Sequence, residues 1–315
     1  MTLPMGRAMR EVFGSTMADL ATHDPRIVML DGDVGSSTKA DIFEKAHPER
    51  YLQMGIAEQN MVGVAAGLAT VGLKPFVSTF VAFAVVRPLD QIRVLVAQTG
   101  LPVTITAGYV GLFTGRAGKT HQIVDDVSIM RAMPGMVTIS PADDIETDRV
   151  LRWAATYGGP AFIRLVRDET QRLFDDSYAF EFGKARLVRD GSDVTLISTG
   201  SQTPRVVDAA EILAGQGISA QVLHVPTIKP LDVEAIVAAA EHTGRVFTVE
   251  EHTVIGGLGG AVAETLSEHR PTRLTRLGLQ DIYTMSASNE DLLDAYGLSA
   301  VRVAEQVRDG LKVSA

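Results

Sequence analysis

The stretch that decides the fold is QMGIAEQNMVGVAAGLATVGLKPFVSTF, residues 53–80. Its first part, residues 57–72, is a run of small and apolar side chains at helical spacing. Its last part, residues 74–80, is short, apolar and rich in aromatic and β-branched residues, which is typical of a buried strand. A helix that leads directly into such a strand predicts a parallel α/β arrangement.

The same alternation extends in both directions from this stretch. Further strands are expected at residues 26–30, 102–108, 135–140 and 160–166, with helices at 87–100 and 141–158. Residues 168–190 are charged and aromatic, and they interrupt the pattern. It restarts with strands at 193–199, 219–225, 245–252 and 272–278, and with helices that begin near Thr203, Asp232 and Leu258.

These patterns predict an α/β protein of two domains, each a mainly parallel sheet flanked by helices. We place the first domain at residues 7–170, an interdomain linker at 171–190, and a smaller domain of about four strands at 191–312. A chain of 315 residues is long enough for two domains that each have a core.

The composition excludes several classes of protein. Apolar residues make up 46% of the chain and charged residues 21%, as in a globular protein. The net charge of −9 argues against nucleic acid or an anionic membrane as a partner. The absence of cysteine excludes disulfides, thiolate metal sites and thiol nucleophiles. Because we find neither a signal peptide nor an apolar run of the ~18 residues that span a membrane, we expect a cytoplasmic protein.

Glu58 is a carboxylate at the start of an apolar helix, with little near it in the sequence that could pair with its charge. One interpretation is structural, because an acid in the first turn of a helix meets the positive end of the helix dipole. The other is functional: the carboxylate hydrogen-bonds a heterocyclic nitrogen and holds a proton for chemistry.

Two further motifs allow both a structural and a functional interpretation. In LDGDVGSST, residues 30–38, Asp31 and Asp33 could bind magnesium or brace the turn, and the hydroxyls of residues 36–38 could meet an anion. Phe80 and Phe83 are one helical turn apart, as in a packed core or in a stacking platform for a flat ligand.

Three other motifs contain residues that could act either in structure or in function. His121 lies in the polar glycine-bearing loop GRAGKTHQ, residues 115–122, which is a favourable place for a working imidazole. Arg164 and Arg167 straddle the end of a strand, which suggests either recognition of an anionic group or a surface ion pair. The turn VIGGLGGAV, residues 254–262, does not match the dinucleotide fingerprint, so close packing or a subunit contact explains its glycines better.

The order of these pieces resembles one family. MREVFG, DGDVGSS, MGIAEQNM, STFVAF, GKTHQ, MRAMPGM and RLVR follow one another between residues 9 and 167, and STGSQ, VEEH and GGLGG follow between 198 and 260. The series closely resembles the C-terminal half of transketolases, which comprises a pyrimidine-binding domain and a transketolase C-terminal domain. The resemblance covers about residues 7 to 310.

The resemblance implies that thiamin diphosphate is the cofactor. In this family a glutamate bonds N1′ of the aminopyrimidine and favours the tautomer that removes a proton from the thiazolium ring, and Glu58 matches that glutamate. Phe80 and Phe83 match the aromatic residues beside the pyrimidine ring. His121 matches the histidine that contacts the donor sugar and assists proton transfer, and Asp33 matches an aspartate near the cofactor.

The substrate-binding residues of the family are matched only in part in this sequence. Arg10, Ser37 and Arg167 match residues that grip a sugar phosphate in the family. Tyr109 stands where the family has a histidine that contacts phosphate, and Ala117 replaces an aspartate that reads a substrate hydroxyl. We therefore expect an altered substrate: another sugar phosphate, a sulfo-sugar or a specialised metabolite.

The cofactor's diphosphate and its Mg²⁺ or Ca²⁺ are bound in this family by G-D-G and a later asparagine. This sequence contains no G-D-G, and neither of its asparagines, Asn60 and Asn289, lies where that ligand would be. The resemblance implies a split enzyme whose partner subunit holds the metal, with two copies of each chain in a heterotetramer. The small-residue helix containing Gly63, Ala66, Gly67 and Ala69 would pack at the subunit interface.

Two alternatives remain open at this point. The β-subunit of a 2-oxo acid dehydrogenase or acetoin-type enzyme shares the architecture and the glutamate, although THQ, MRAMPGM and Arg167 favour a transketolase. A transketolase-like paralogue without catalytic activity is the second, which Glu58 and His121 argue against and the changes at Tyr109 and Ala117 favour.

Overall fold

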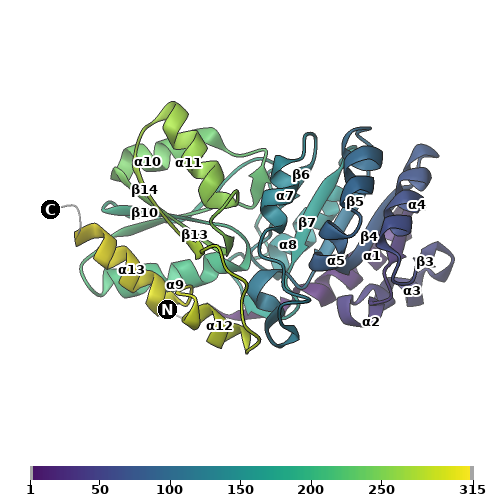
Figure 1. The fold of residues 1–315 in the computed structure, drawn as a ribbon, viewed down its shortest axis with the longest axis horizontal. Helices are drawn as coiled ribbons and strands as arrows, with labels where there is room; N and C mark the ends of the chain where they lie inside the picture. The colour runs from purple at the N-terminus through teal and green to yellow at the C-terminus, as the bar shows by residue number, and fades with distance from the viewer. Residues whose placement is uncertain (1–2, 313–315) are drawn as a thin grey trace.

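The computed structural model describes residues 3–312, which form two α/β units side by side (Figure 1). The first unit contains a seven-stranded sheet with the order β12-β6-β7-β5-β4-β2-β3. All its neighbouring strands are parallel except β12 and β6. The strands are β2 (Ile27–Asp31), β3 (Tyr51–Gln53), β4 (Lys74–Phe80), β5 (Thr104–Gly108), β6 (Val137–Ile139), β7 (Ala161–Leu165) and β12 (Thr227–Lys229).

Helices cover both faces of this sheet, which explains why its central strands are apolar throughout. One face packs against α4 (Glu58–Thr70), α5 (Val81–Val86) and the π-helical segment η2 (Ile92–Ala97). The other packs against α1 (Met9–His23), α3 (Ala40–Ala46) and α8 (Asp144–Ala154). The remaining helical segments are α2 (Gly35–Thr38), η1 (Pro48–Arg50), α6 (Leu89–Gln91), η3 (Gly111–Ala117) and α7 (Asp126–Ala132).

The second unit contains a five-stranded sheet with the order β14-β13-β10-β11-β9. Its strands are β9 (Arg186–Arg189), β10 (Val194–Ser198), β11 (Ala220–His224), β13 (Arg245–Thr253) and β14 (Arg273–Leu279). The two faces are covered by α9 (Thr203–Ala214) with α13 (Ala300–Lys312), and by α10 (Val233–Thr243) with α11 (Leu258–His269). A short helix, α12 (Asn289–Ala295), precedes α13.

The fold class and the predicted parallel strands are confirmed, and three details differ. The smaller sheet has a fifth strand, β9, which pairs antiparallel with β11 and comes from the segment expected as a linker. Residues 169–171 of that connection form β8 (Glu169–Gln171), which pairs with β1 (Met5–Ala8). The helix expected at 87–100 is shorter: it begins after Pro88, whose backbone is non-helical, and runs as α6 and the π-helical η2 to Ala97. The domain boundaries remain predictions.

The glycines of residues 254–262 serve close packing, as expected. A Cβ on Gly259 would lie 2.7 Å from Oγ1 of Thr248, and one on Gly257 would lie 2.2 Å from Oε2 of Glu250. The Glu250 carboxylate accepts the amides of Leu258 and Gly259 at the start of α11, at 2.7 and 2.8 Å. Burial raises the pKa of this carboxyl to about 7.

A buried ion-pair network joins the two units. The guanidinium of Arg164 on β7 donates to Asp126 at 2.6 Å and to Glu251 of β13 at 2.8 Å. Arg164 is 2% exposed, and although burial opposes its charge, the two carboxylates raise its pKa. The expectation that Arg164 recognises an anionic ligand together with Arg167 is therefore wrong, because its donors are occupied inside the protein.

None of the helices within residues 3–312 is long and apolar enough to cross a membrane. The cytoplasmic location stays a prediction.

We expect Arg164→Met to lower the free energy of unfolding by about 3 kcal/mol, because it leaves two buried carboxylates without a counter-charge. Urea titration followed by circular dichroism measures this change. Lys45→Met is the control, since the exposed Lys45–Asp41 pair contributes at most about 0.5 kcal/mol. Equal stability of the two variants would contradict the role assigned to Arg164.

Candidate active site

The candidate residues gather at the carboxyl ends of the parallel strands, where ligands bind in open α/β sheets. Phe80 is the last residue of β4, Tyr109 directly follows β5, and Arg167 lies two residues beyond β7. The turn after β2 carries Asp33 and Ser37. Loops from neighbouring strands therefore bring residues that are distant in sequence to one edge of the first sheet.

Glu58 is the first residue of α4 and is 3% exposed. Its Oε1 accepts a hydrogen bond of 2.6 Å from Nη1 of Arg87. No close neighbour in the sequence pairs with this carboxylate, but a residue 29 positions later supplies a cation. A buried carboxylate needs such a partner, since leaving it unpaired is costly.

Arg87 also contacts an aromatic ring. It follows α5 directly, one helical turn after Phe83, and its guanidinium carbon lies 3.9 Å from the centroid of the Phe83 ring. Arg87 is thus bonded to the acid at one edge and covers the ring with its flat face, as in a cation–π contact. Its side chain is 43% exposed.

Four rings continue from this point as an aromatic cluster. The centroids of Phe83 and Phe80 are 5.8 Å apart, and the His121 ring lies 5.3 Å from Phe83 and 5.9 Å from Phe80. Tyr109 stacks on Phe80 at 4.0 Å. The Nδ1 atom of His121 is 2.9 Å from the Thr120 hydroxyl. The structure therefore brings together Phe80, Phe83 and His121, as expected.

Two arginines lie at the far end of the cluster. The Tyr109 hydroxyl accepts a 2.9 Å hydrogen bond from Nε of Arg167, whose Nη1 donates to Asp168 at 3.1 Å. Arg10 donates from Nη1 to the carbonyl of Ser37 at 3.3 Å, and its Nε is buried without a partner. Arg10, Tyr109 and Arg167 line one small cavity. Arg10, Ser37 and Arg167 are thus brought together, with Tyr109 between them.

The loop that carries His121 has an unusual backbone and is held from both domains. Tyr109, Gly111 and Gly115 have φ values of 64°, 44° and 52°, in the left-handed region. A Cβ on Gly115 would lie 2.3 Å from Oδ1 of Asn289 in α12. Gln122 donates to the Gly115 carbonyl at 2.8 Å and accepts the hydroxyl proton of Thr284. Ala117 ends η3 within this loop.

The turn after β2 is braced by Asp31, as one of the two interpretations of that residue expects. Its buried carboxylate accepts the amides of Val34 and Gly35, both at 3.0 Å, and burial raises its pKa. Asp33 is exposed with a φ of 64°, and its amide donates to Gln53. A role of Asp33 at the cofactor stays a prediction. Residues 3–312 contain no group of three or more acids or histidines that could hold a metal ion.

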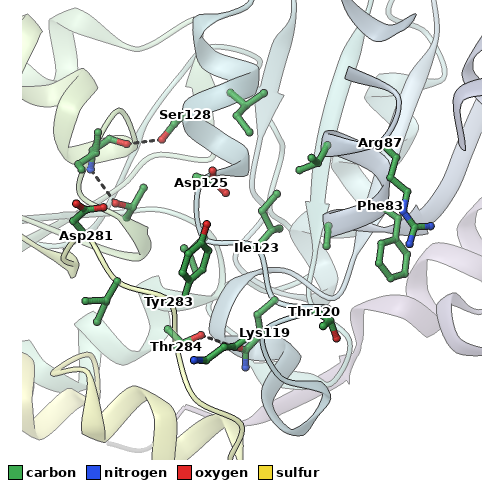
Figure 2. Close-up of a pocket in the computed structure, with 18 residues that line it drawn as sticks. Phe83, Arg87, Lys119, Thr120, Ile123, Asp125, Ser128, Asp281, Tyr283 and Thr284 are labelled. Carbon is green, nitrogen blue, oxygen red and sulfur yellow. Dashed lines mark hydrogen bonds between the residues drawn. The ribbon is translucent and has the colours of Figure 1, made fainter. Parts of the chain in front are cut away.

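A cleft of about 900 Å³ lies beside these residues, between the two units. Figure 2 shows Phe83 and Arg87 at one side of the cleft, with Asp281 and Tyr283 at the opposite side. Asp125 lines the middle, and burial together with the neighbouring Asp126 raises its pKa. Tyr283 is 83% exposed, so the cleft is open at that edge.

The residues form one continuous series. It begins with the acid Glu58 and the Arg87 guanidinium over the Phe83 ring, continues with the His121 imidazole and Tyr109, and ends with Arg10 and Arg167. A flat nitrogen heterocycle fits the acid end, and an anionic group fits the arginine end. Arg87 was not singled out from the sequence. Its four-residue spacing from Phe83 could have indicated the ring contact, but no local signal indicates its pairing with Glu58.

Comparisons with known proteins agree with these features. The family model described as transketolase, pyrimidine binding domain, matches residues 5–172, and the model described as transketolase, C-terminal domain, matches residues 183–303. The 6-deoxy-6-sulfo-D-fructose transketolase subunit SqwH of Clostridium sp. (strain MSTE9) is 40% identical over 304 residues, which cover 96% of this chain and 94% of that protein. An apulose-4-phosphate transketolase subunit of Phocaeicola vulgatus is 36% identical over 306 residues, covering 97% and 98%.

A solved structure is also similar along the whole described chain. It is a split gene transketolase described as an inactive beta4 tetramer, with 41% sequence identity and a TM-score of 0.91. The match covers 98% of this chain and 100% of that chain.

Proposed function

The chain belongs to the transketolase family, whose members depend on thiamin diphosphate, and we propose that it works as the C-terminal subunit of a split transketolase. In this role it transfers a two-carbon ketol unit from a ketose to an aldose acceptor. The observation that carries the proposal is the buried Glu58, which Arg87 links to the cluster of the Phe83, Phe80 and His121 rings.

The residues at the acid end fit the aminopyrimidine of the cofactor. Glu58 offers a carboxylate that is shielded from water, and Phe83 offers a flat apolar face that the same arginine, Arg87, contacts. The guanidinium of Arg87, itself planar and rich in N–H groups, already occupies both positions. When bound, the cofactor supplies the carbon nucleophile and the electron sink that cleavage next to a ketone requires. Glu58 holds the proton at the pyrimidine N1′ in this scheme.

His121 serves the substrate. Its ring contacts both Phe80 and Phe83, and Tyr109 contacts Phe80, so a ligand seated on the phenylalanine rings would come within reach of the imidazole. There it donates to substrate oxygens and moves a proton to or from a hydroxyl, a step for which an imidazole is suited near neutral pH.

The arginine end supports a substrate with an anionic tail. Arg10 and Arg167 concentrate positive charge in a protein whose net charge is −9, so the attraction is local. The two relatives described above are named for a sulfonated sugar and a sugar phosphate. We propose that this chain's donor or acceptor likewise ends in a sulfonate or a phosphate.

A separate subunit is proposed to hold the cofactor's diphosphate and its Mg²⁺ or Ca²⁺. Support comes from the lack of a candidate metal cluster within residues 3–312 and from the match of this chain to transketolase proteins that are named as subunits. We propose an assembly of two copies of each chain, with the sites at the interface between them.

Two alternatives are separated by simple assays. A 2-oxo acid dehydrogenase subunit would support decarboxylation of pyruvate rather than ketol transfer between sugars. A paralogue without catalytic activity would support neither reaction when combined with its partner.

We expect Glu58→Gln to lower kcat of the assembled enzyme at least ~100-fold, because the neutral amide cannot share a proton with N1′ of the pyrimidine ring. Turnover of a ketose donor with an aldose acceptor measures this, and light scattering checks that assembly is unchanged. The exposed Glu44→Gln is the matched control. Full activity of Glu58→Gln would refute the role of this carboxylate.

The isolated chain is expected to show negligible ketol transfer, even with excess thiamin diphosphate and magnesium, because its sequence has no G-D-G motif and residues 3–312 have no candidate metal cluster. Addition of the partner subunit is expected to restore turnover. Robust activity of the chain alone would refute the split-enzyme proposal.

Tyr109→Phe is expected to raise KM for an anionic-tailed sugar about tenfold, because Arg167 loses the acceptor that orients its guanidinium while the Phe80 stack is kept. The comparison is a sugar of the same length without the anion, whose KM should change much less. Equal changes for both sugars would show that Tyr109 does not act through the anion.

A further inference from the structure

Arg87 occupies the two positions that a cofactor pyrimidine needs. Its Nη1 donates to Oε1 of Glu58 at 2.6 Å, and its guanidinium carbon lies 3.9 Å from the centroid of the Phe83 ring. A guanidinium and an aminopyrimidine are both flat: the guanidinium donates an N–H to the carboxylate, and the pyrimidine N1′ would bind the same carboxyl group through a shared proton. The two groups therefore compete for the same carboxylate and the same ring face.

We propose that Arg87 is a placeholder for the cofactor: it pairs with Glu58 in the cofactor-free subunit and leaves both Glu58 and Phe83 when the pyrimidine binds. This inference rests on the proposed function, because it takes thiamin diphosphate as the ligand of Glu58.

The placeholder solves a problem of the free subunit. Glu58 is 3% exposed, so without a cofactor its charge would be buried and unpaired unless a cation of the same chain reached it. Arg87 reaches it from the first position after α5, where its long side chain remains 43% exposed. A half-exposed arginine is a suitable temporary partner, because its charge can return to water when the ligand arrives.

Replacement of Arg87 by the pyrimidine requires movement of the Arg87 side chain only, and not of its backbone. The carbonyl of Arg87 accepts a 3.3 Å hydrogen bond from Gln59, which ties the backbone of Arg87 to α4. The side chain borders the cleft of about 900 Å³, which gives the guanidinium room to turn away from Glu58 (Figure 2). Cofactor binding thus breaks one ion pair and one ring contact. The free energy of these two contacts is lost on binding, which lowers the affinity for the cofactor.

The first test is a double-mutant cycle in the isolated chain, measured by thermal unfolding. Arg87→Met should lower the melting temperature, whereas the same change in a Glu58→Gln background should lower it much less, because no buried charge is then left unpaired. Arg93→Met is the matched control, since the Arg93–Asp90 pair is exposed on both sides. Additive effects of the two substitutions would show that the pair does not stabilise the free subunit.

The second test is the affinity of the assembled enzyme for thiamin diphosphate, measured by calorimetry with magnesium present. Arg87→Met should bind the cofactor about fivefold more tightly than the wild type, the equivalent of about 1 kcal/mol. Arg87→Gln, which keeps a neutral donor, should fall between the two and provides a second variant if the first folds poorly. Arg93→Met should leave the affinity unchanged.

Unchanged or weaker binding by both Arg87 variants would overturn the placeholder and would indicate that Arg87 helps to hold the cofactor. Failure of the proposed function gives a different result, because the wild-type assembly would then not bind thiamin diphosphate at all. The double-mutant cycle in the isolated chain does not depend on the cofactor. It therefore tests the Arg87–Glu58 ion pair separately from the identity of the ligand that binds Glu58.

Discussion

The buried guanidinium of Arg164 is the contact on which the rest of the structure depends, because it pairs with one carboxylate from each half of the chain. Asp126 opens α7 in the first unit, and Glu251 lies on β13 in the second. Glu251 also accepts the amide of Leu112, and it fills the space where a Cβ on Gly111 would lie. Since buried charges tolerate little displacement, the network sets the position of both units and of the loop that begins at Tyr109.

That loop shows how the second unit contributes to a site whose ring and acid residues all lie in the first. The backbone around Arg116 and Gly115 is tied to Ser286, Asn289 and, through Gln122, to Thr284. We infer that the C-terminal unit fixes the position of His121 next to the Phe80 and Phe83 rings, rather than supplying catalytic groups.

The sequence predicts the buried parallel strands well, because a strand covered on both faces must be a continuous apolar run. It does not predict β9 or β12, which are short antiparallel edges with charged residues. The motifs placed Phe80, Phe83 and His121 together correctly, since all follow carboxyl ends of strands. Arg164 and Arg167 were wrongly paired. An odd separation at a strand end points two side chains in opposite directions, and only the second faces the site. The Glu58–Arg87 pair joins two elements, which periodicity cannot detect.

The strand β12 has a consequence for how the protein is made. It belongs in sequence to the second half, yet it pairs antiparallel with β6 and completes the edge of the first sheet. During synthesis, the backbone donors and acceptors along that edge of β6 stay open until residues 227–229 have left the ribosome. Roughly ninety residues separate the end of β6 from the end of β12, and while they are translated the β6 edge is bare, a template for mispairing with another nascent chain. The first sheet is therefore completed only late in elongation.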